Sequence, residues 1–321
     1  MDKDNKPLIR PGPGIRISFI HQGTIIFEMV NQNVMVLSII IVNYNVKLHL
    51  ELCLHSVKKS ISGMPAEIIV IDNNSSDGSR EYLPPVFKEV KFIFNEENTG
   101  FARACNQGIK NSTGKYVLFL NPDTILVENC LKKCIDFFES HKTAGAVGVR
   151  MINEKGVFLK ESKRGFPSPA ASFFKLFGLA SIFPASKLFA GYYMGHLEKN
   201  ESNPVDILSG AFMMIPRDVL EQVGYFDEAF FMYGEDIDMS YRIRQAGFEN
   251  YYLGEISINH LKGKSTPYDA HHINIFYSAM AIFVNKHYAD KKSKIFTQIL
   301  LAGISFRKMI ARVGILFRLS K

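Results

Sequence analysis

The stretch VMVLSIIIVNY, residues 34–44, decides the fold class of this chain. It is a continuous apolar run rich in β-branched residues, a pattern typical of a strand that is buried on both faces. Two similar runs follow, EIIVI at 67–71 and KYVLFL at 115–120, and stretches with helical spacing separate the three. Strands that alternate with helices in this way predict an α/β domain built on a mostly parallel sheet.

The same patterns predict the remaining elements along the chain. In the first half they are helices at 48–61, 101–109 and 126–140 and strands at 90–94 and 144–149. In the second half they are an ordered stretch at 205–215, helices at 217–223 and from 235, a strand at 251–258 and helices from 270 to the end. Residues 157–204 are rich in Pro, Gly and aromatic residues and are expected to form a long functional excursion with short helices.

Length and composition place the chain among globular proteins. It has 321 residues, of which 47% are hydrophobic and 21% charged. The four cysteines form no CxxC pair and no histidine cluster accompanies them, so we expect buried free thiols in a reducing cytosol. The first 34 residues start as a polar stretch broken by Pro and Gly and lack the pattern of a signal peptide, so we expect a poorly patterned N-terminal extension.

The net charge of +7 lies in the C-terminal tail. From residue 286 to residue 321 there are nine Lys or Arg and a single acid, Asp290, with many apolar residues among them. This composition favours a helix on a membrane surface, although an ordinary amphipathic helix packed on the domain would have the same pattern. No nucleic-acid partner is expected, and no apolar run reaches the roughly 18 residues that a membrane-spanning helix needs.

Carboxylates follow two of the predicted strands. Asp72 comes directly after EIIVI, and Asp123 comes after KYVLFL and the dipeptide Asn121-Pro122. Ligands of parallel α/β sheets bind beyond the carboxyl ends of the strands. Asp72 is therefore placed to accept hydrogen bonds from a base or ribose, and Asp123 to bind an oxygen-preferring cation such as Mg²⁺. Asp77, in the loop after Asp72, is expected only to cap a helix.

Three further motifs suggest how a ligand would be held. NTGFARACN (98–106) places Gly and Ala where the backbone must approach something closely. GEDID (234–238) presents three acids at a helix start, which the helix dipole favours. The apolar residues FFM (230–232) just upstream would desolvate such a carboxylate, raise its proton affinity and let it act as a base. His260 follows a strand and would add another ligand to this carboxylate set.

Taken together and in this order, the motifs resemble those of the family 2 glycosyltransferases, in particular the bacterial rhamnosyltransferase and galactofuranosyltransferase-like branch. The matching segments are SIIIVNYN (38–45), VIDNNSSDGS (70–79), NTGFARACNQG (98–108), LFLNPDT (118–124), residues 209–247 and HLKGKS (260–265). The resemblance implies a GT-A fold, a Rossmann-like sheet flanked by helices, over residues 35–268. This domain would have a nucleotide half at 35–125 and an acceptor half at 126–268, followed by a basic helical tail at 269–321.

The resemblance also assigns roles to residues. The nucleotide-sugar site would comprise Asn43, Tyr44, Asp72, Asn74, Asn98, Gly100, Ala102, Asn106, Asn121 and Asp123. The acceptor side would comprise Arg164, Gly210 and Glu235. Asp123 and His260 would hold Mg²⁺ or Mn²⁺, and Asp236 would be the general base. Asn121 stands where many relatives have the first acid of the DxD metal motif, which leaves the contribution of position 121 to metal binding open.

The function implied by this resemblance is an inverting, metal-dependent hexosyl- or deoxyhexosyltransferase, cytoplasmic and peripheral at the inner face of the cell membrane. It would use a UDP- or dTDP-sugar and a glycan or lipid-linked acceptor, in polysaccharide or lipid-linked glycan synthesis, and a homodimer is left open. One alternative is a nucleotide-sugar-binding protein that lost turnover, which Asn121 favours and Asp123 opposes. Another is a sugar nucleotidyltransferase, which would need a Gly-rich basic phosphate loop that IVNYN (41–45) does not provide.

Overall fold

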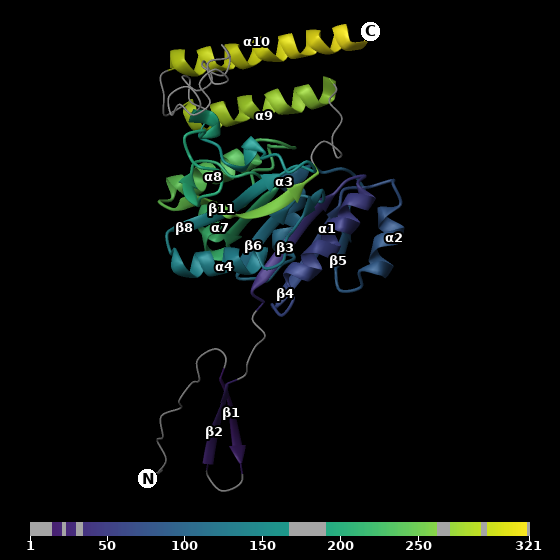
Figure 1. Cartoon of the computed structure of the whole chain (residues 1–321), viewed down its shortest axis with the longest axis vertical. Helices are drawn as coiled ribbons and strands as arrows, with labels where there is room; N and C mark the ends of the chain where they lie inside the picture. The colour runs from purple at the N-terminus through teal and green to yellow at the C-terminus, as the bar shows by residue number, and fades with distance from the viewer. Residues whose placement is uncertain are drawn as a thin grey trace, which may run out of the picture.

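The computed structural model describes residues 15–20, 24–29, 35–166, 191–261, 270–289 and 294–319. Its centre is a nine-stranded sheet with the order β5-β4-β3-β6-β10-β8-β11-β7, and β9 pairs with β11 beside that path. The strands are β3 (Leu37–Asn43), β4 (Ala66–Asp72), β5 (Lys91–Phe94), β6 (Tyr116–Leu120), β7 (Thr124–Ile125), β8 (Ala144–Ile152), β9 (Asn203–Val205), β10 (Phe212–Pro216) and β11 (Glu249–His260). Figure 1 shows helices on both sides of this sheet, as the predicted α/β class requires.

Strand β3 lies inside the sheet and is buried along its whole length. Ile39 and Ile41 belong to one apolar cluster, and Ile40 and Val42 belong to a second. Helices cover both faces: α1 (Lys47–Ser60), α2 (Ser79–Val86) and α4 (Cys130–Ser140) contribute to the first cluster, and α3 (Phe101–Lys110), α7 (Arg217–Val223) and α8 (Glu235–Gln245) to the second. Because both faces are covered, the sequence of this strand is apolar throughout instead of alternating.

The sheet is parallel only in part. β3 pairs in parallel with β4 and β6, and β4 pairs in parallel with β5, as predicted. β10 then runs antiparallel to both β6 and β8, whereas β11 is parallel to β8 and antiparallel to β7 and β9. The expected mostly parallel sheet is therefore a mixed sheet. β10 enters it from the long excursion and not through a strand–helix–strand crossover, so the rule that makes neighbouring strands parallel does not apply to it.

Several element boundaries differ from the predictions, and β11 (Glu249–His260) is longer at both ends than the predicted 251–258. α4 begins at Cys130 and not at residue 126, because Thr124 and Ile125 pair with β11 and Asn129 adopts a left-handed φ of 60° just before the helix. The ordered stretch predicted at 205–215 is divided between the end of β9 and most of β10.

In the excursion, the described helical turns are η1 (Lys160–Ser162) and η2 (Gly191–Tyr193). Residues 167–190, the middle of the excursion in which short helices were expected, lie outside the described residues. The four cysteines are free and buried, as predicted.

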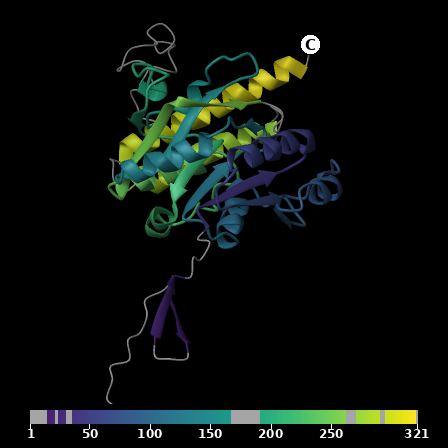
Figure 2. The same cartoon turned by 60° about the horizontal axis from the view of Figure 1, so that its bottom comes forward.

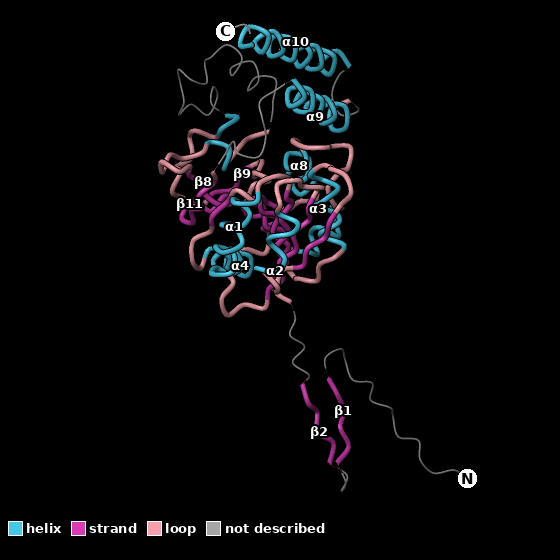
Figure 3. Tube along the Cα trace, turned by 90° about the vertical axis from the view of Figure 1, so that its right-hand side faces the viewer, coloured by secondary structure: helices cyan, strands magenta, loops and turns pink. Residues whose placement is uncertain are grey.

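The N-terminal extension contains a hairpin that the sequence reading missed. β1 (Ile15–Ile20) pairs antiparallel with β2 (Thr24–Met29). The signal was present as a strict alternation in β1, where Ile15, Ile17 and Phe19 alternate with Arg16 and Ser18. The hairpin lies apart from the nine-stranded sheet in Figure 2 and Figure 3.

Two long helices end the chain. α9 (Ala270–Tyr288) and α10 (Lys294–Leu319) are stacked on one end of the molecule, with α9 next to the domain (Figure 1). The prediction that the chain is helical from residue 270 onward agrees with these two helices. Across the parts of the chain that the structure describes, no helix has both the length and the hydropathy to cross a bilayer.

Candidate active site

Two polar side chains meet at the carboxyl ends of β3 and β4. Asn43 and Asp72 are register partners and are almost fully buried, and Nδ2 of Asn43 donates to Oδ2 of Asp72 at 2.7 Å. The other carboxylate oxygen, Oδ1 of Asp72, accepts the N–H of Ser75 at 2.9 Å and lies 3.7 Å from Nε of Arg80. Asp72 therefore shapes the loop after β4, and a base or ribose would have to share the carboxylate with these partners.

The loop beside this pair carries the exposed groups predicted for the nucleotide site. The Tyr44 side chain is 43% exposed. Asn74 is exposed, has a left-handed φ of 65°, and accepts a hydrogen bond from Arg80 at 3.1 Å. Asp77 accepts the N–H of Lys47 at 2.7 Å and that of Ser79 at 3.1 Å, and these are the first residues of α1 and α2. The capping role predicted for Asp77 is confirmed.

A glycine lets two segments that are far apart in the sequence approach each other beside this loop. Gly100 has a φ of 82°, and a Cβ added there would lie 2.4 Å from the carbonyl oxygen of Phe231. The same carbonyl oxygen accepts the N–H of Phe101, the first residue of α3, at 2.7 Å. Oδ1 of Asn98 accepts the N–H of Gly100 at 3.0 Å. The motif around Gly100 therefore fixes the segment that leads into α8.

Two residues predicted for the nucleotide-sugar site lie beneath its surface. Ala102 is fully buried in the second apolar cluster. Asn106 is buried, donates to the carbonyl of Phe226 at 2.8 Å and to Glu228 at 3.0 Å, and accepts the N–H of Phe226 at 3.0 Å. The amide of Asn106 holds the chain before α8 and Ala102 packs in the core, so any part these two residues have in shaping the nucleotide-sugar site would be indirect. Their assignment to that site stays a prediction.

Asp123 and His260, far apart in the sequence, are brought together by strand pairing. β7 and β11 pair so that Thr124 faces His260. Nε2 of His260 lies 3.3 Å from Oδ1 of Asp123, and both side chains are buried. Asn121 stands before this pair, and its backbone carbonyl accepts the hydroxyl of Thr124 at 2.7 Å. The bond closes the turn that carries Asp123.

The Asp123–His260 pair fits a divalent cation. Oδ1 of Asp123 and Nδ1 of His260 are buried polar atoms without a hydrogen-bond partner, which is costly unless a ligand satisfies them. The Asp123 carboxylate suits Mg²⁺ or Mn²⁺, and Mg²⁺ is usually held by one or two carboxylates together with substrate phosphates. The His260 imidazole would add a nitrogen ligand of the kind that divalent transition metals accept. Within the described ranges no third His, Cys, Asp or Glu completes a metal-binding cluster. Gly263 and Ser265, in the motif that His260 begins, lie outside those ranges.

The predicted acceptor side is organised around Asp236. Its Oδ2 accepts Nη2 of Arg164 at 2.5 Å and the N–H of Gly210 at 3.1 Å. Nη2 of Arg164 also donates to the carbonyl of Leu208 at 2.9 Å. The Asp236 side chain keeps 14% of its surface exposed, so it is held rigidly but can still be reached from solvent. The structure thus brings together three of the predicted residues, Asp236, Arg164 and Gly210.

Glu235 has the environment that the sequence reading expected for the base. It is 6% exposed, and its Oε2 is buried without a hydrogen-bond partner. Burial, together with the charge of Asp236, raises the pKa of Glu235 to about 8. Burial therefore raises the proton affinity of Glu235. Its neighbour Asp236 is instead held by an ion pair with Arg164.

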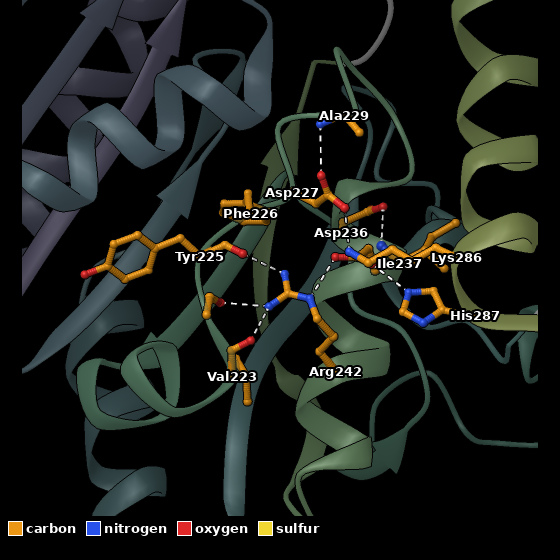
Figure 4. A network of polar contacts seen from close by, with 12 residues as sticks. Val223, Tyr225, Phe226, Asp227, Ala229, Asp236, Ile237, Arg242, Lys286 and His287 are labelled. Atoms are coloured by element: carbon orange, nitrogen blue, oxygen red, sulfur yellow. Dashed lines mark hydrogen bonds and ion pairs between the residues drawn. The ribbon is translucent and has the colours of Figure 1, made fainter. Parts of the chain in front are cut away.

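The acid at position 238 was expected to serve the helix start, but it is the centre of a buried network. Figure 4 shows its partners Arg242, Lys286 and His287. Asp238 is fully buried; Oδ1 contacts His287 Nε2 at 2.7 Å and Lys286 Nζ at 2.8 Å, and Oδ2 accepts Arg242 Nε at 2.8 Å. Burial alone would raise the pKa of Asp238, but the His287 hydrogen bond and the nearby cations outweigh it and lower the pKa. Arg242 also donates to the carbonyl of Tyr225 at 2.8 Å. The network joins α8 to α9.

Sequence reasoning missed this network, although part of its signal was present. Asp238 and Arg242 are four residues apart on a predicted helix, a spacing that brings side chains together. The contribution of Lys286 and His287 has no local signal, because these residues reach Asp238 only through the packing of α9.

Comparison with known sequences places these observations in a family. A model of "Glycosyl transferase family 2" matches residues 38–224. The chain is 30% identical over 226 residues to the low-salt glycan biosynthesis hexosyltransferase Agl10 of Haloferax volcanii, covering 69% of this chain and 65% of that protein, just under two thirds of its length. It is 28% identical over 270 residues to the N-acetylglucosaminyl-diphospho-decaprenol L-rhamnosyltransferase of Mycobacterium tuberculosis, covering 80% of this chain and 85% of that protein.

Solved structures show the same fold. The mannosyltransferase PcManGT from Pyrobaculum calidifontis, in complex with GDP-Man and Mn²⁺, matches with a TM-score of 0.54 and 17% identity, over 86% of this chain and 71% of that one. Residues 1–349 of S. aureus TarS, in complex with UDP-GlcNAc, match with a TM-score of 0.54 and 18% identity, over 84% and 71%. Identities this low establish the fold alone.

Proposed function

Because the chain belongs to glycosyl transferase family 2, we propose that it moves a sugar from a nucleoside-diphosphate sugar to an acceptor hydroxyl with inversion at the anomeric carbon. The observation that carries this proposal is the Asp123–His260 pair. Each residue keeps a buried polar atom without a hydrogen-bond partner, and the pair lies where β7 begins and β11 ends. We further propose that residues 35–125 provide the nucleotide half of the site and residues 126–268 the acceptor half.

On the donor side, the chain's own residues would hold the nucleotide. Asn43 and Asp72 fix the loop that would receive the base, and Tyr44 offers an exposed ring beside them. Asp123 and His260 would hold Mg²⁺ or Mn²⁺, which when bound would neutralise the diphosphate leaving group. Asn121 would contribute at most through its amide oxygen, since its backbone already serves the turn.

On the acceptor side, Asp236 would act as the general base. It would take the proton from the acceptor hydroxyl while the hydroxyl oxygen forms its bond to the anomeric carbon and the bond to the diphosphate breaks. One displacement of this kind inverts the anomeric centre. Arg164 and Gly210 would keep the Asp236 carboxylate aimed, because both donate to its Oδ2.

Donor binding tests this function. Saturation-transfer NMR with UDP-, dTDP- and GDP-sugars, each with and without Mn²⁺, should reveal one nucleotide class that binds more tightly with the cation. A chain that binds no nucleotide sugar under any of these conditions contradicts the proposal.

We place the enzyme at a membrane surface, acting on a lipid-linked acceptor in polysaccharide or glycan synthesis. The support is an apolar stripe along one face of α10. Its members are exposed and follow the helical repeat: Ile295, Ile299, Phe306, Met309, Ile310 and Val313. Between residues 294 and 319 the chain has five Lys or Arg and no acid. An apolar face flanked by cations suits an anionic bilayer. The name of the related rhamnosyltransferase gives its substrate as a decaprenol-linked sugar diphosphate.

The double variant Ile299→Glu/Phe306→Glu should weaken binding to phosphatidylglycerol-containing vesicles by at least about tenfold, because two large apolar side chains no longer enter the bilayer. Co-sedimentation of the purified full chain measures this loss. The matched control Gln298→Glu/Ser305→Glu makes the same charge change at exposed polar positions of α10. If both double variants lose binding equally, the stripe makes no contribution beyond charge and the proposed insertion is wrong.

A further inference from the structure

A small apolar hollow of about 200 Å³ lies between α9 and the segment that leads into α8. Its walls include Phe230, Phe231 and Met232 from that segment and Ile275, Ala279 and Ile282 from α9. No acid lines it. A sugar or nucleotide needs polar groups placed around it, whereas these walls offer mainly hydrocarbon. The chemistry of the hollow therefore suits an apolar ligand.

One wall of the hollow is formed by the segment that comes just before the proposed base in the sequence. The carbonyl of Phe231, one of its walls, accepts the N–H of Phe101 beside Gly100, and Asp236 follows a few residues later. Its other wall, α9, is fixed to α8 because Lys286 and His287 both contact the buried Asp238 (Figure 4). A ligand in the hollow would consequently sit at a fixed place relative to Asp236.

The surroundings of the hollow indicate which apolar ligand it takes. Nη2 of Arg312, in α10, donates at 2.5 Å to Asn274, which lines the hollow. A cation thus lies beside an apolar recess, on the same pair of helices as the apolar stripe. A hydrocarbon chain that ends in a phosphate or diphosphate complements both features.

We propose that this hollow binds the first part of the hydrocarbon chain of a lipid-linked acceptor, with the phosphate end of the lipid toward Arg312. The inference rests on the proposed function, whose acceptor site it deepens. Bound in this way, the lipid is held at the membrane face of the enzyme while its sugar reaches Asp236. Acceptors with a long chain gain affinity over the same sugar on a short chain.

The chain contains no tryptophan, so a single introduced tryptophan reports on the hollow. Ser278 lines it and is exposed, so Ser278→Trp places the fluorophore at its edge with little disturbance of the core. We expect 12-bromododecyl phosphate to quench the fluorescence of this variant saturably. Unbrominated dodecyl phosphate should restore the signal, and inorganic phosphate should not.

The matched control is Asn285→Trp, at an exposed position of the same helix that does not line the hollow. A second variant tests the walls. Adding Ile275→Gln to Ser278→Trp places a polar amide against the hydrocarbon chain of the ligand. The bromododecyl phosphate concentration for half-quenching should then rise by about tenfold. If Ser278→Trp does not fold, tryptophan at Ile282 serves as the reporter with the same ligands.

Several outcomes overturn the proposal: equal quenching of the Ser278→Trp and Asn285→Trp variants, no quenching of either, or full reversal by inorganic phosphate. Equal quenching by a short-chain brominated phosphatidylcholine would assign the hollow to bilayer lipid and not to an acceptor. The assay needs neither donor nor turnover. If the protein binds bromododecyl phosphate at the hollow but transfers no sugar, only the proposed function is refuted. If the protein transfers sugar but shows no site-selective quenching, only the proposed lipid site in the hollow is refuted.

Discussion

Asp236→Asn should lower the rate of sugar transfer by about 10²- to 10⁴-fold and leave the affinity for the nucleotide sugar unchanged. The amide cannot accept the proton of the acceptor hydroxyl, but its oxygen can still face Arg164 and the N–H of Gly210, which now bind Oδ2 of Asp236. The fold should therefore survive the change. Single-turnover rates measure the chemical step, and calorimetry with the donor measures binding.

The neighbouring acid provides the comparison for this variant. Because the pKa of Glu235 is raised to about 8, its carboxyl is largely protonated at neutral pH and Glu235→Gln replaces it with a neutral group of the same shape. We expect a much smaller fall in rate than for Asp236→Asn. If Glu235→Gln abolishes transfer and Asp236→Asn does not, the base is Glu235 and our assignment is wrong.

Glu235 also makes stability depend on pH in a definite direction. Its pKa is higher in the folded chain than the ordinary 4.5, so the folded state binds the proton more tightly. Its contribution to stability is full below pH 4.5 and falls by up to about 1.4 kcal/mol per pH unit as pH rises toward 8. Glu235→Gln should remove this slope from the free energy of unfolding.

The parts of the fold that the sequence predicted well are those with a local cause. β3 is buried on both faces, and its unbroken apolar run states this directly. Asp72 and Asp123 each follow a strand in the sequence, so their place at the edge of the sheet follows from the strand assignment. The start of α8 at Glu235 is marked by acids that the helix dipole favours.

What the sequence could not provide depends on contacts between distant segments. Whether β10 runs parallel or antiparallel to β6 leaves no trace in its own residues. Glu235 and Asp236 are adjacent in the chain and share the same local pattern. Glu235 is nevertheless more deeply buried than Asp236, and this difference arises from the surrounding fold. The resemblance assigns Asn106 to the nucleotide-sugar site, and its contacts with Phe226 become visible only in the folded chain.

Asp123→Ala should remove the dependence of donor binding on Mn²⁺, lowering affinity by at least about tenfold, which corresponds to about 1.4 kcal/mol. In the present structure Oδ1 of Asp123 is buried and has no hydrogen-bond partner, although Nε2 of His260 lies 3.3 Å away, so the carboxylate is poorly satisfied when no cation binds it. Removing it should therefore leave the free energy of unfolding without metal unchanged or higher. Calorimetry with the donor, with and without Mn²⁺, and chemical denaturation measure the two effects.

Asp77→Ala is the matched control. Asp77 comes shortly after a strand, β4, as Asp123 comes shortly after β6, but Asp77 serves the fold. It accepts backbone N–H groups at the starts of α1 and α2, so its loss should cost about 1 kcal/mol of stability and leave the effect of Mn²⁺ intact. The two variants should thus show opposite patterns, one losing metal dependence and the other losing stability. If Asp123→Ala destabilises the chain as Asp77→Ala does while Mn²⁺ still strengthens donor binding, the Asp123 carboxylate serves the turn after β6 and the cation binds elsewhere.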